Sequence, residues 1–162
     1  MFLTEYFLNP GELIFTQKPV IIKTVLGSCV AVVIYDRVNR FGGMCHYLLP
    51  ESSDQHRSTK YGDVAIPTLI NKFYLSGSEK RNLDVSILGG AFVIFDHKEV
   101  FFIGDRNIEI ANKICNSNQL AIKVSQVGGE SGRRVRFNTK TNELTVGLLS
   151  DIHLDDLFRR QD

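Results

Sequence analysis

The residues from Cys29 to Tyr35 form an uninterrupted apolar run that is rich in β-branched side chains. Successive side chains of a strand point to opposite faces of its sheet, so a strand that is apolar at every position has both faces covered. The run is also far too short to cross a membrane as a helix. We therefore expect a central strand whose sheet is buried on both sides.

Further segments with β-branched or alternating apolar residues predict seven more strands. They cover residues 12–16, 19–25, 42–49, 83–88, 120–127, 133–137 and 144–149. Together with two helices, these strands predict a sheet-rich α/β (α+β) sandwich that forms a single domain over residues 1–162. Residues 151–162 are expected to form a loosely held tail of this domain.

The two predicted helices carry apolar residues at the spacing of one helix face. The first follows Tyr61, and we expect its regular part to begin near Pro67, where a missing N–H does no harm. The second is expected to begin at a capping residue, Asp105 or Asn107, and to end at residues 116–118.

The charge balance excludes several classes of partner. The 162 residues contain 19 Lys and Arg against 18 Asp and Glu, which leaves a net charge of +1. Such a balance provides no general attraction to nucleic acid or to an anionic membrane, so we expect neither as a partner. The basic residues Arg133, Arg134 and Arg136 are interpreted as the solvated face of a strand. The pairs Gly89-Gly90 and Gly128-Gly129 lack the strand–helix context of a phosphate-binding loop and predict turns or close strand packing.

Cys29, Cys45 and Cys115 are the three cysteines, an odd number without CxxC spacing. This usage argues against a disulfide framework and against a zinc site, and it favours a reducing compartment. Residues 1–10 lack the basic start of a secretory signal. We therefore expect a cytoplasmic monomer that needs neither a metal nor another cofactor.

Cys29 and His46 are predicted to lie on one face of a β-hairpin. A two-residue turn at Arg37-Val38 would pair Cys29 directly with His46. A longer turn would pair His46 with Ala31, which shares a face with Cys29. Directly opposed Cβ atoms lie about 4.5–5.5 Å apart and diagonal ones about 7–8 Å apart, so both registers allow contact between thiol and imidazole. A slip of one residue would put the two side chains on opposite faces and remove the pairing.

A thiol beside an imidazole is a nucleophile beside its base, which is typical of acyl-transfer chemistry. The small-residue turn Gly27-Ser28 leaves backbone N–H groups free, and these could stabilise an oxyanion. Thr24 could orient the imidazole of His46 through its hydroxyl or its carbonyl. The alternative interpretation is that Cys29 and His46 are merely packed in the core, as many such residues are.

The remaining cysteines and histidines are expected to have no catalytic role. The same parity that pairs Cys29 with His46 sends Cys45 to the opposite face, and Cys115 lies on the apolar face of the second helix. Both are predicted to be buried as small hydrophobic residues. His56, His97 and His153 lie in polar or loop-like segments and are expected to be exposed.

Several short blocks, taken in their order and spacing, are similar to the CheD family of chemoreceptor glutamine deamidases. The blocks are residues 24–30, 42–50, 60–63, 88–91, 103–108, 127–129 and 132–135. The resemblance extends over roughly residues 8–148. It implies a fold like the catalytic domain of the cytotoxic necrotizing factor toxins.

The resemblance implies that Cys29 is the nucleophile, His46 the base and Thr24 the residue that orients the base. It implies deamidation of particular glutamines on the cytoplasmic helices of chemotaxis receptors, without a cofactor. Some family members also hydrolyse receptor methyl esters, and some bind the phosphatase CheC, which competes with the receptor. The sequence differs from many relatives at Cys45, where they often have asparagine or a small residue.

Two other functions stay open at this point. Another cysteine hydrolase, such as a peptidase or a small-amide amidase, would use the same nucleophile and base but would need a deep pocket. A non-catalytic adaptor that binds a receptor or a phosphatase would keep the fold without the chemistry. The presence of Cys29, His46 and Thr24 argues against the adaptor.

Overall fold

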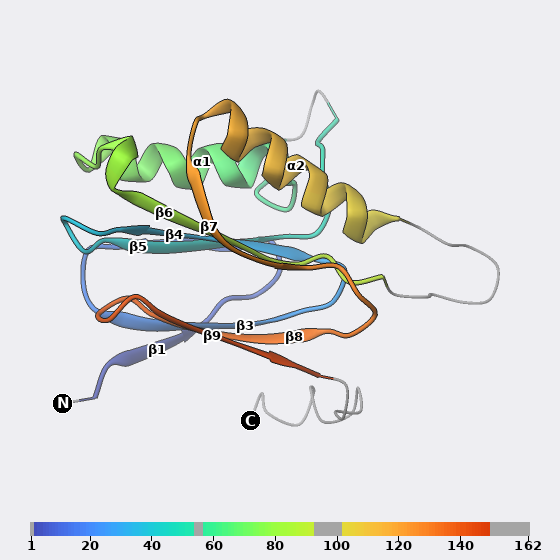
Figure 1. Cartoon of the computed structure of the whole chain (residues 1–162), viewed down its shortest axis with the longest axis horizontal. Helices are drawn as coiled ribbons and strands as arrows, with labels where there is room; N and C mark the ends of the chain where they lie inside the picture. The colour runs from blue at the N-terminus through green and yellow to red at the C-terminus, as the bar shows by residue number, and fades with distance from the viewer. Residues whose placement is uncertain (1, 54–56, 93–101, 150–162) are drawn as a thin grey trace.

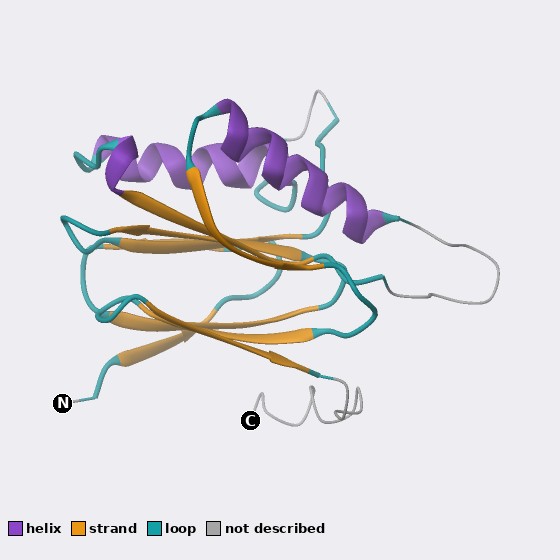
Figure 2. Cartoon of the chain, in the orientation of Figure 1, coloured by secondary structure: helices purple, strands orange, loops and turns teal. Residues whose placement is uncertain are grey.

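The computed structural model describes residues 2–53, 57–92 and 102–149, and these residues form three layers (Figure 1). A four-stranded sheet lies against a five-stranded sheet, and two helices cover the other face of the five-stranded sheet (Figure 2). The five-stranded sheet is therefore the middle layer. The predicted sheet-rich α+β sandwich with two main helices is confirmed.

The elements are assigned to the layers as follows. The four-stranded sheet has the order β1 (Thr4–Phe7), β3 (Val20–Leu26), β8 (Arg133–Asn138) and β9 (Glu143–Leu148). The five-stranded sheet has the order β2 (Leu13–Thr16), β5 (Gly42–Tyr47), β4 (Val30–Asp36), β6 (Leu83–Gly89) and β7 (Ala121–Val127). The helices are α1 (Gly62–Leu75), α2 (Ile103–Ser117) and the short 3₁₀ helix η1 (Lys80–Asn82).

β4 is the central strand that the apolar run predicted. All seven of its residues are buried. Val30, Val32 and Ile34 belong to the hydrophobic cluster between the middle sheet and the helices. The alternate residues Ala31 and Val33 belong to the cluster between the two sheets. The period of two along one strand thus contributes to two separate cores.

The strand predictions are confirmed with small shifts at their ends, but one strand was missed. β1 runs parallel to β3, with Thr4 opposite Val20 and Phe7 opposite Lys23. All four residues of β1 are exposed, so the segment shows no buried face that its sequence pattern could reveal. Its position at the edge of the sheet is decided by pairing with β3.

Both predicted helix starts are wrong. α1 begins at Gly62 and contains Pro67 in its interior. Its first turn is held from outside, because the N–H of Gly62 donates to the carbonyl of Leu49 (2.8 Å) and the N–H of Asp63 to that of Pro50 (3.0 Å). These external hydrogen bonds let a regular turn precede the proline, whose missing N–H interrupts only one helical hydrogen bond.

α2 begins at Ile103, with Phe102 at the N-cap and no side-chain capping hydrogen bond. Neither Asp105 nor Asn107 therefore caps it. Asn107 is fully buried inside the helix and makes its hydrogen bonds to other segments. The predicted end of the helix is confirmed, since Asn118 is the C-cap residue.

The structure also describes the two remaining cysteines and the basic residues of β8. Cys45 and Cys115 are both buried in the cluster beneath the helices, as predicted. The basic strand face is only partly confirmed, because Arg133 is buried and donates to the carbonyl of Gly89 at 3.3 Å. In β8, alternate side chains point inward, and the parity of Arg133 is that of the buried Val135.

The tail 151–162 and the side chains of His56, His97 and His153 lie outside the described residues. The predictions for them therefore remain predictions. Among the helices that the structure describes, none is long and apolar enough to cross a membrane.

We expect Phe73→Ala to lower the free energy of unfolding by about 3–5 kcal/mol, because a fully buried aromatic side chain is replaced by a cavity. Phe73 lies on the buried face of α1 and packs edge-to-face on Phe15, with ring centroids 4.8 Å apart. Urea unfolding measures the change. Leu75→Ala on the same helix is the control, because that side chain is 80% exposed and its loss should cost less than about 0.5 kcal/mol.

Candidate active site

The hairpin of β4 and β5 places Cys29 and His46 on one face, as predicted. Its register pairs Ala31 with His46, which is the register of the longer turn. The turn explains this choice, because the Asp36 carboxylate accepts hydrogen bonds from the N–H groups of Val38 (2.9 Å) and Asn39 (3.0 Å). Such carboxylate contacts stabilise a wider turn than a two-residue loop.

Cys29 lies immediately before β4 and packs against the cluster between the two sheets. The Ala31–His46 pairing puts the imidazole in the same layer. Cys45 belongs to the opposite cluster, beneath the helices. The sequence-based parity of all three residues is therefore confirmed.

The side chain of His46 lies between the two sheets, and residues from its own sheet edge and from the other sheet hold it in place. Its side chain is almost fully buried. Its backbone N–H donates to the carbonyl of Glu12 (3.1 Å), and its carbonyl accepts from the N–H of Gly11 (2.7 Å). Thr24 of β3, in the other sheet, places its Oγ1 at 2.8 Å from His46 Nδ1. The predicted contact between Thr24 and His46 is thus made by the threonine hydroxyl.

The hydrogen bonds of Thr24 define the tautomer of His46. Thr24 Oγ1 also lies 2.7 Å from the carbonyl oxygen of Leu8, which can only accept. The single hydroxyl proton therefore goes to Leu8, and the oxygen must accept a proton from Nδ1. This assignment follows from the hydrogen-bond network, as tautomers usually do. It leaves Nε2 with a free lone pair, and Nε2 has no hydrogen-bond partner among the described residues.

Burial favours the neutral forms of both Cys29 and His46. It lowers the pKa of His46 to about 4, against smaller raising effects of the Leu8 carbonyl and the Glu12 carboxylate. It also raises the pKa of the Cys29 thiol, against a smaller lowering effect of the residue's own backbone N–H. A low-dielectric site penalises each charged form. The core between the two sheets therefore holds a neutral thiol and a neutral imidazole, whose Nε2 lone pair makes no hydrogen bond within the described residues.

The loop that carries Cys29 is fixed through its carbonyl groups. The Gly27 carbonyl accepts from the N–H of Ala91 (2.9 Å), and the Cys29 carbonyl accepts from the N–H of Gly90 (2.8 Å). The Ser28 carbonyl accepts from the side-chain amide of Asn107 (3.0 Å). The N–H groups of the same three loop residues donate to no backbone carbonyl of the described chain. They are available to stabilise negative charge on a bound molecule.

Gly89 is required for this arrangement, and the sequence analysis identified only its capacity for close packing. Its φ of +104° lies in the region that favours glycine. A Cβ at this position would lie 2.3 Å from the Cys29 carbonyl oxygen. The close strand packing predicted for Gly89-Gly90 is thus confirmed, and it occurs against the carbonyl group of Cys29.

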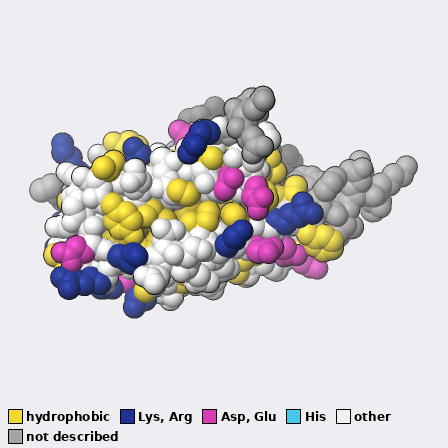
Figure 3. Space-filling model, turned by 90° about the horizontal axis from the view of Figure 1, so that it is seen from above, with side chains coloured by type: hydrophobic (Ala, Val, Ile, Leu, Met, Phe, Trp, Pro, Cys, Tyr) yellow, Lys and Arg dark blue, Asp and Glu magenta, His cyan; other side chains and the backbone are white. Residues whose placement is uncertain are grey.

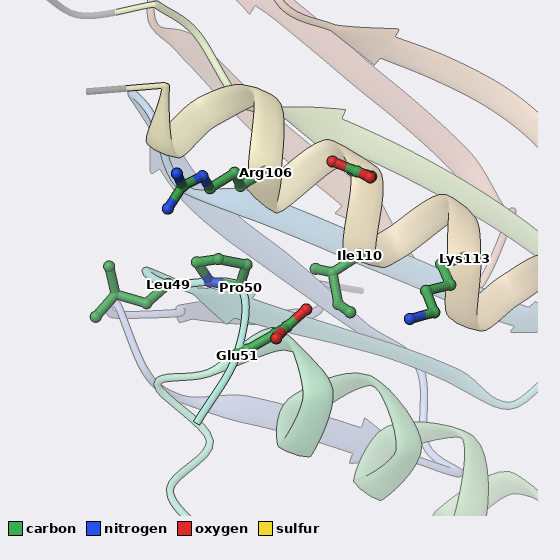
Figure 4. A pocket seen from close by; sticks show the side chains of 7 residues that line it. Leu49, Pro50, Glu51, Arg106, Ile110 and Lys113 are labelled. Atoms are coloured by element: carbon green, nitrogen blue, oxygen red, sulfur yellow. The ribbon is translucent and has the colours of Figure 1, made fainter. Parts of the chain in front are cut away.

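A groove lies between α2 and the segment that follows β5, and neither Cys29 nor His46 lines it (Figure 4). Its volume is about 500 Å³. It is lined by Leu49, Pro50, Glu51, Arg106, Glu109, Ile110 and Lys113. The groove joins residues 49–51 to residues 106–113, which are far apart in the sequence, so no local sequence pattern predicts it.

Seen from the helix side, the surface carries acidic and basic side chains in a mixed arrangement (Figure 3). This agrees with the near-zero net charge of the sequence. Within the described ranges, no cluster of His, Cys, Asp or Glu has the arrangement of a metal site.

The sequence was compared with families and with individual proteins. Residues 48–147 match the model of the family described as "CheD chemotactic sensory transduction". This chain belongs to the CheD family. The match covers more than half of the chain but begins after Cys29 and His46. The alignments with two individual CheD relatives are longer, at 93% and 94% of this chain, and therefore include both residues.

Three CheD relatives illustrate the similarity. A protein of Rhodospirillum rubrum is 36% identical over 93% of this chain and 86% of its own length. One of Geobacter sulfurreducens is 33% identical over 94% of this chain and 95% of its own length. One of Anaeromyxobacter dehalogenans is 34% identical over 83% of this chain and 78% of its own length. All three carry the name "Probable chemoreceptor glutamine deamidase CheD", with a number in two of them.

We expect a small alkylating reagent at neutral pH to modify Cys29 and to leave Cys45 and Cys115 intact. Cys29 is only half-buried, whereas the other two are fully buried. Burial also raises the pKa of Cys45 to about 12 and that of Cys115 to about 11. Peptide mapping by mass spectrometry locates the modified thiol.

The control for this labelling experiment is the same reaction in denaturant, where all three thiols should react. Modification of Cys45 before Cys29 in the folded protein would contradict the burial and parity described above.

Proposed function

We propose that this chain hydrolyses glutamine side-chain amides of chemoreceptors to glutamate and ammonia, with Cys29 as nucleophile and His46 as base. Thr24 is the residue that orients the base. The observation that supports this most is the defined tautomer of His46. Its Nε2 has no hydrogen-bond partner in the part of the chain that the structure describes and lies, like Cys29, in the core between the two sheets. The names of the CheD relatives supply the substrate class.

In the first half of the proposed reaction, Nε2 of His46 takes the proton of the Cys29 thiol while Sγ attacks the amide carbon of glutamine. The carbonyl π electrons move to oxygen and form a tetrahedral oxyanion. The imidazolium then gives its Nε2 proton to the amide nitrogen. The C–N bond breaks, and ammonia leaves a thioester on Cys29.

In the second half, His46 takes a proton from water, and the resulting hydroxide attacks the thioester carbon. The C–S bond breaks, and the sulfur recovers the proton from the imidazolium. The products are a glutamate side chain and the original thiol. The N–H groups of Ser28 and Cys29 stabilise the oxyanion in both halves, and Gly27 supplies the turn that exposes them.

Because Cys29 and His46 are both neutral before substrate binds, the proton passes from the thiol to the imidazole during the attack on the amide and not before it. The lowered pKa of His46 and the raised pKa of Cys29 both disfavour a thiolate–imidazolium pair before substrate binds. The oxyanion donors must then stabilise charge as it forms. This favours a general-base mechanism over attack by a preformed thiolate.

The groove between α2 and residues 49–51 offers a contact surface to a protein substrate, which a small free amide does not need. Four of its seven lining side chains are charged: Glu51, Arg106, Glu109 and Lys113. Within the described residues, these four form no ion pair with one another. Such a surface suits the charged exterior of another protein.

Two further points of the proposal rest on the family resemblance alone. A CheC-type phosphatase, which some family members bind, would compete with the receptor for this chain, and receptor methyl esters are further substrates where that activity is present.

The proposal also keeps the expectations from the sequence: the chain acts in the cytoplasm as a monomer, without a cofactor and without nucleic acid.

We expect the protein to convert specific glutamines of a receptor cytoplasmic fragment to glutamates, and Cys29→Ala to abolish the conversion. His46→Asn should lower the rate by about 10²–10⁴-fold, the usual contribution of a general base. Mass spectrometry of receptor peptides measures the conversion. Cys45→Ala is the matched control and should retain activity, because that thiol faces the other core.

The three candidate functions give different outcomes in this experiment. Conversion that persists in Cys29→Ala would refute the mechanism. Absence of conversion by the unmodified protein, together with binding to the receptor fragment, would favour the adaptor. Activity on small amides or peptides but not on receptors would favour another cysteine hydrolase.

We expect kcat/KM to stay level on the acid side down to about pH 5 and to fall around pH 4. His46 must be neutral to act as base, and burial lowers its pKa to about 4, so protonation removes the base only below that value. Initial rates across the pH range measure the profile, with circular dichroism to confirm that the protein stays folded. An acid limb centred near pH 6.5 would show that His46 is solvated in the active form.

A further inference from the structure

Asn107 is a fully buried polar side chain with no role in the proposed proton transfers. It lies in α2, and its Nδ2 donates to two carbonyls, that of Ser28 at 3.0 Å and that of Leu48 at 2.9 Å. Carbonyls only accept, so the amide orientation is defined and both of its N–H donors are used. Its own backbone carbonyl accepts the hydroxyl of Tyr47 at 2.5 Å.

The amide of Asn107 is connected to both reacting residues. Ser28 directly precedes the nucleophile Cys29, and Leu48 follows His46 by two residues. One rigid amide therefore ties the nucleophile loop to the end of the strand that carries the base. Tyr47, which is fully buried, fixes the helix backbone at the same point.

Because the peptide group is planar, a contact that fixes a carbonyl also fixes the direction of the following N–H, which is an oxyanion donor in the proposed reaction. In a trans peptide, the C=O of one residue and the N–H of the next lie in one plane and point in opposite directions. The described chain contains no cis peptide bond. Holding the Ser28 carbonyl therefore sets the direction of the Cys29 N–H. Holding the Gly27 carbonyl, through the N–H of Ala91, sets the direction of the Ser28 N–H.

The two peptide planes differ in what holds them. The Gly27 carbonyl is held by a backbone donor, whereas the Ser28 carbonyl is held by the Asn107 side chain. The Cys29 N–H is therefore the oxyanion donor whose direction depends on a side chain. A substitution can release it without changing the loop sequence.

We infer that Asn107 is a positioning residue for acyl transfer: it aims the Cys29 N–H at the oxyanion by holding the Ser28 carbonyl. The inference rests on the proposed function in that Cys29 is the nucleophile. It adds a residue of α2 to the site and assigns a task to each of its two N–H donors. One N–H, bound to the Ser28 carbonyl, fixes the direction of the Cys29 N–H. The other, bound to the Leu48 carbonyl, fixes the distance between the loop of Cys29 and the end of the strand that carries His46.

The test compares Asn107→Ala with Asn112→Ala in the full chain. Asn112 is the matched control, because it is an asparagine of the same helix whose Nδ2 donates within the helix, to the Ile108 carbonyl at 3.1 Å. Three reactions of Cys29 are measured. They are conversion of receptor glutamine, hydrolysis of p-nitrophenyl acetate, and alkylation by iodoacetamide.

These reactions separate positioning from general disruption. Glutamine conversion and ester hydrolysis pass through an oxyanion, but alkylation by iodoacetamide does not. We expect Asn107→Ala to lower kcat in the first two reactions by about 10–10²-fold, since loss of one whole oxyanion donor costs about 10²–10³-fold. KM and the alkylation rate should stay within about 2-fold of the unmodified protein. Asn112→Ala should change none of the three.

A second variant keeps the test decisive if Asn107→Ala does not fold. In Asn107→Asp, the ionised carboxylate has no donor for the Ser28 carbonyl, but the protonated acid regains one. Burial beside two carbonyls raises the pKa of such a carboxyl. We expect the ester hydrolysis rate of this variant to rise as the pH falls from 8 to about 5.5, while that of the unmodified protein stays level.

The possible results distinguish failure of the positioning role from failure of the proposed function. Equal loss of alkylation and ester hydrolysis in Asn107→Ala, or a level pH profile in Asn107→Asp, would overturn the positioning role. Ester hydrolysis by Cys29 without receptor conversion would contradict the proposed function and leave the positioning role standing. Absence of any Cys29-dependent ester hydrolysis in the unmodified protein would overturn the inference.

Discussion

The hydrogen bond between Thr24 Oγ1 and His46 Nδ1 is the contact on which the proposed chemistry of this protein depends. It joins a strand of one sheet to a strand of the other, across the core that both sheets bury. The hydroxyl has one proton, and the Leu8 carbonyl takes it. The imidazole must then donate from Nδ1, and its basic nitrogen is Nε2. The stacking of the two sheets therefore brings Thr24 to His46, and this one contact defines the tautomer that the proposed mechanism needs.

Burial gives the site its reactivity and also restricts it. Removing His46 and Cys29 from water favours the neutral form of both, so the imidazole keeps a free lone pair at neutral pH although burial makes it a weaker base. In the proposed reaction charge must then form as the bonds change, and the N–H groups of the loop at residues 27–29 have to stabilise it. Cys45 adjoins His46 in sequence, yet its burial in the other core raises its pKa to about 12. The pleat of one sheet therefore places Cys29 and Cys45 in different cores, with different burial.

The helix layer contributes more than cover for the middle sheet. α2 supplies Asn107, whose amide reaches the nucleophile loop, and the same helix lines the charged groove with Arg106 and Lys113. Gly89 at the end of β6 lets the Cys29 backbone approach closely. The family block that contains Asn107 resembles a helix start in sequence, which hid its role, because an asparagine near a helix N-terminus usually caps it. A capping residue has an exposed hydrogen bond to its own helix, whereas this one is buried and bonds to two other segments.

The sequence by itself determined the features that depend on local periodicity. The all-apolar run predicted a strand covered on both faces, and the pleat required Cys29 and His46 to share a face and Cys45 to point away. The family resemblance added the chemistry. Only the tertiary structure decided the rest. The Asp36 turn selected one of two allowed registers, and external carbonyls allowed α1 to begin before Pro67. The partners of Thr24 and Asn107 come from other layers. The physical reason is range: a strand alternates according to its own covalent geometry, but contacts between layers depend on how separate elements stack, which no local pattern records.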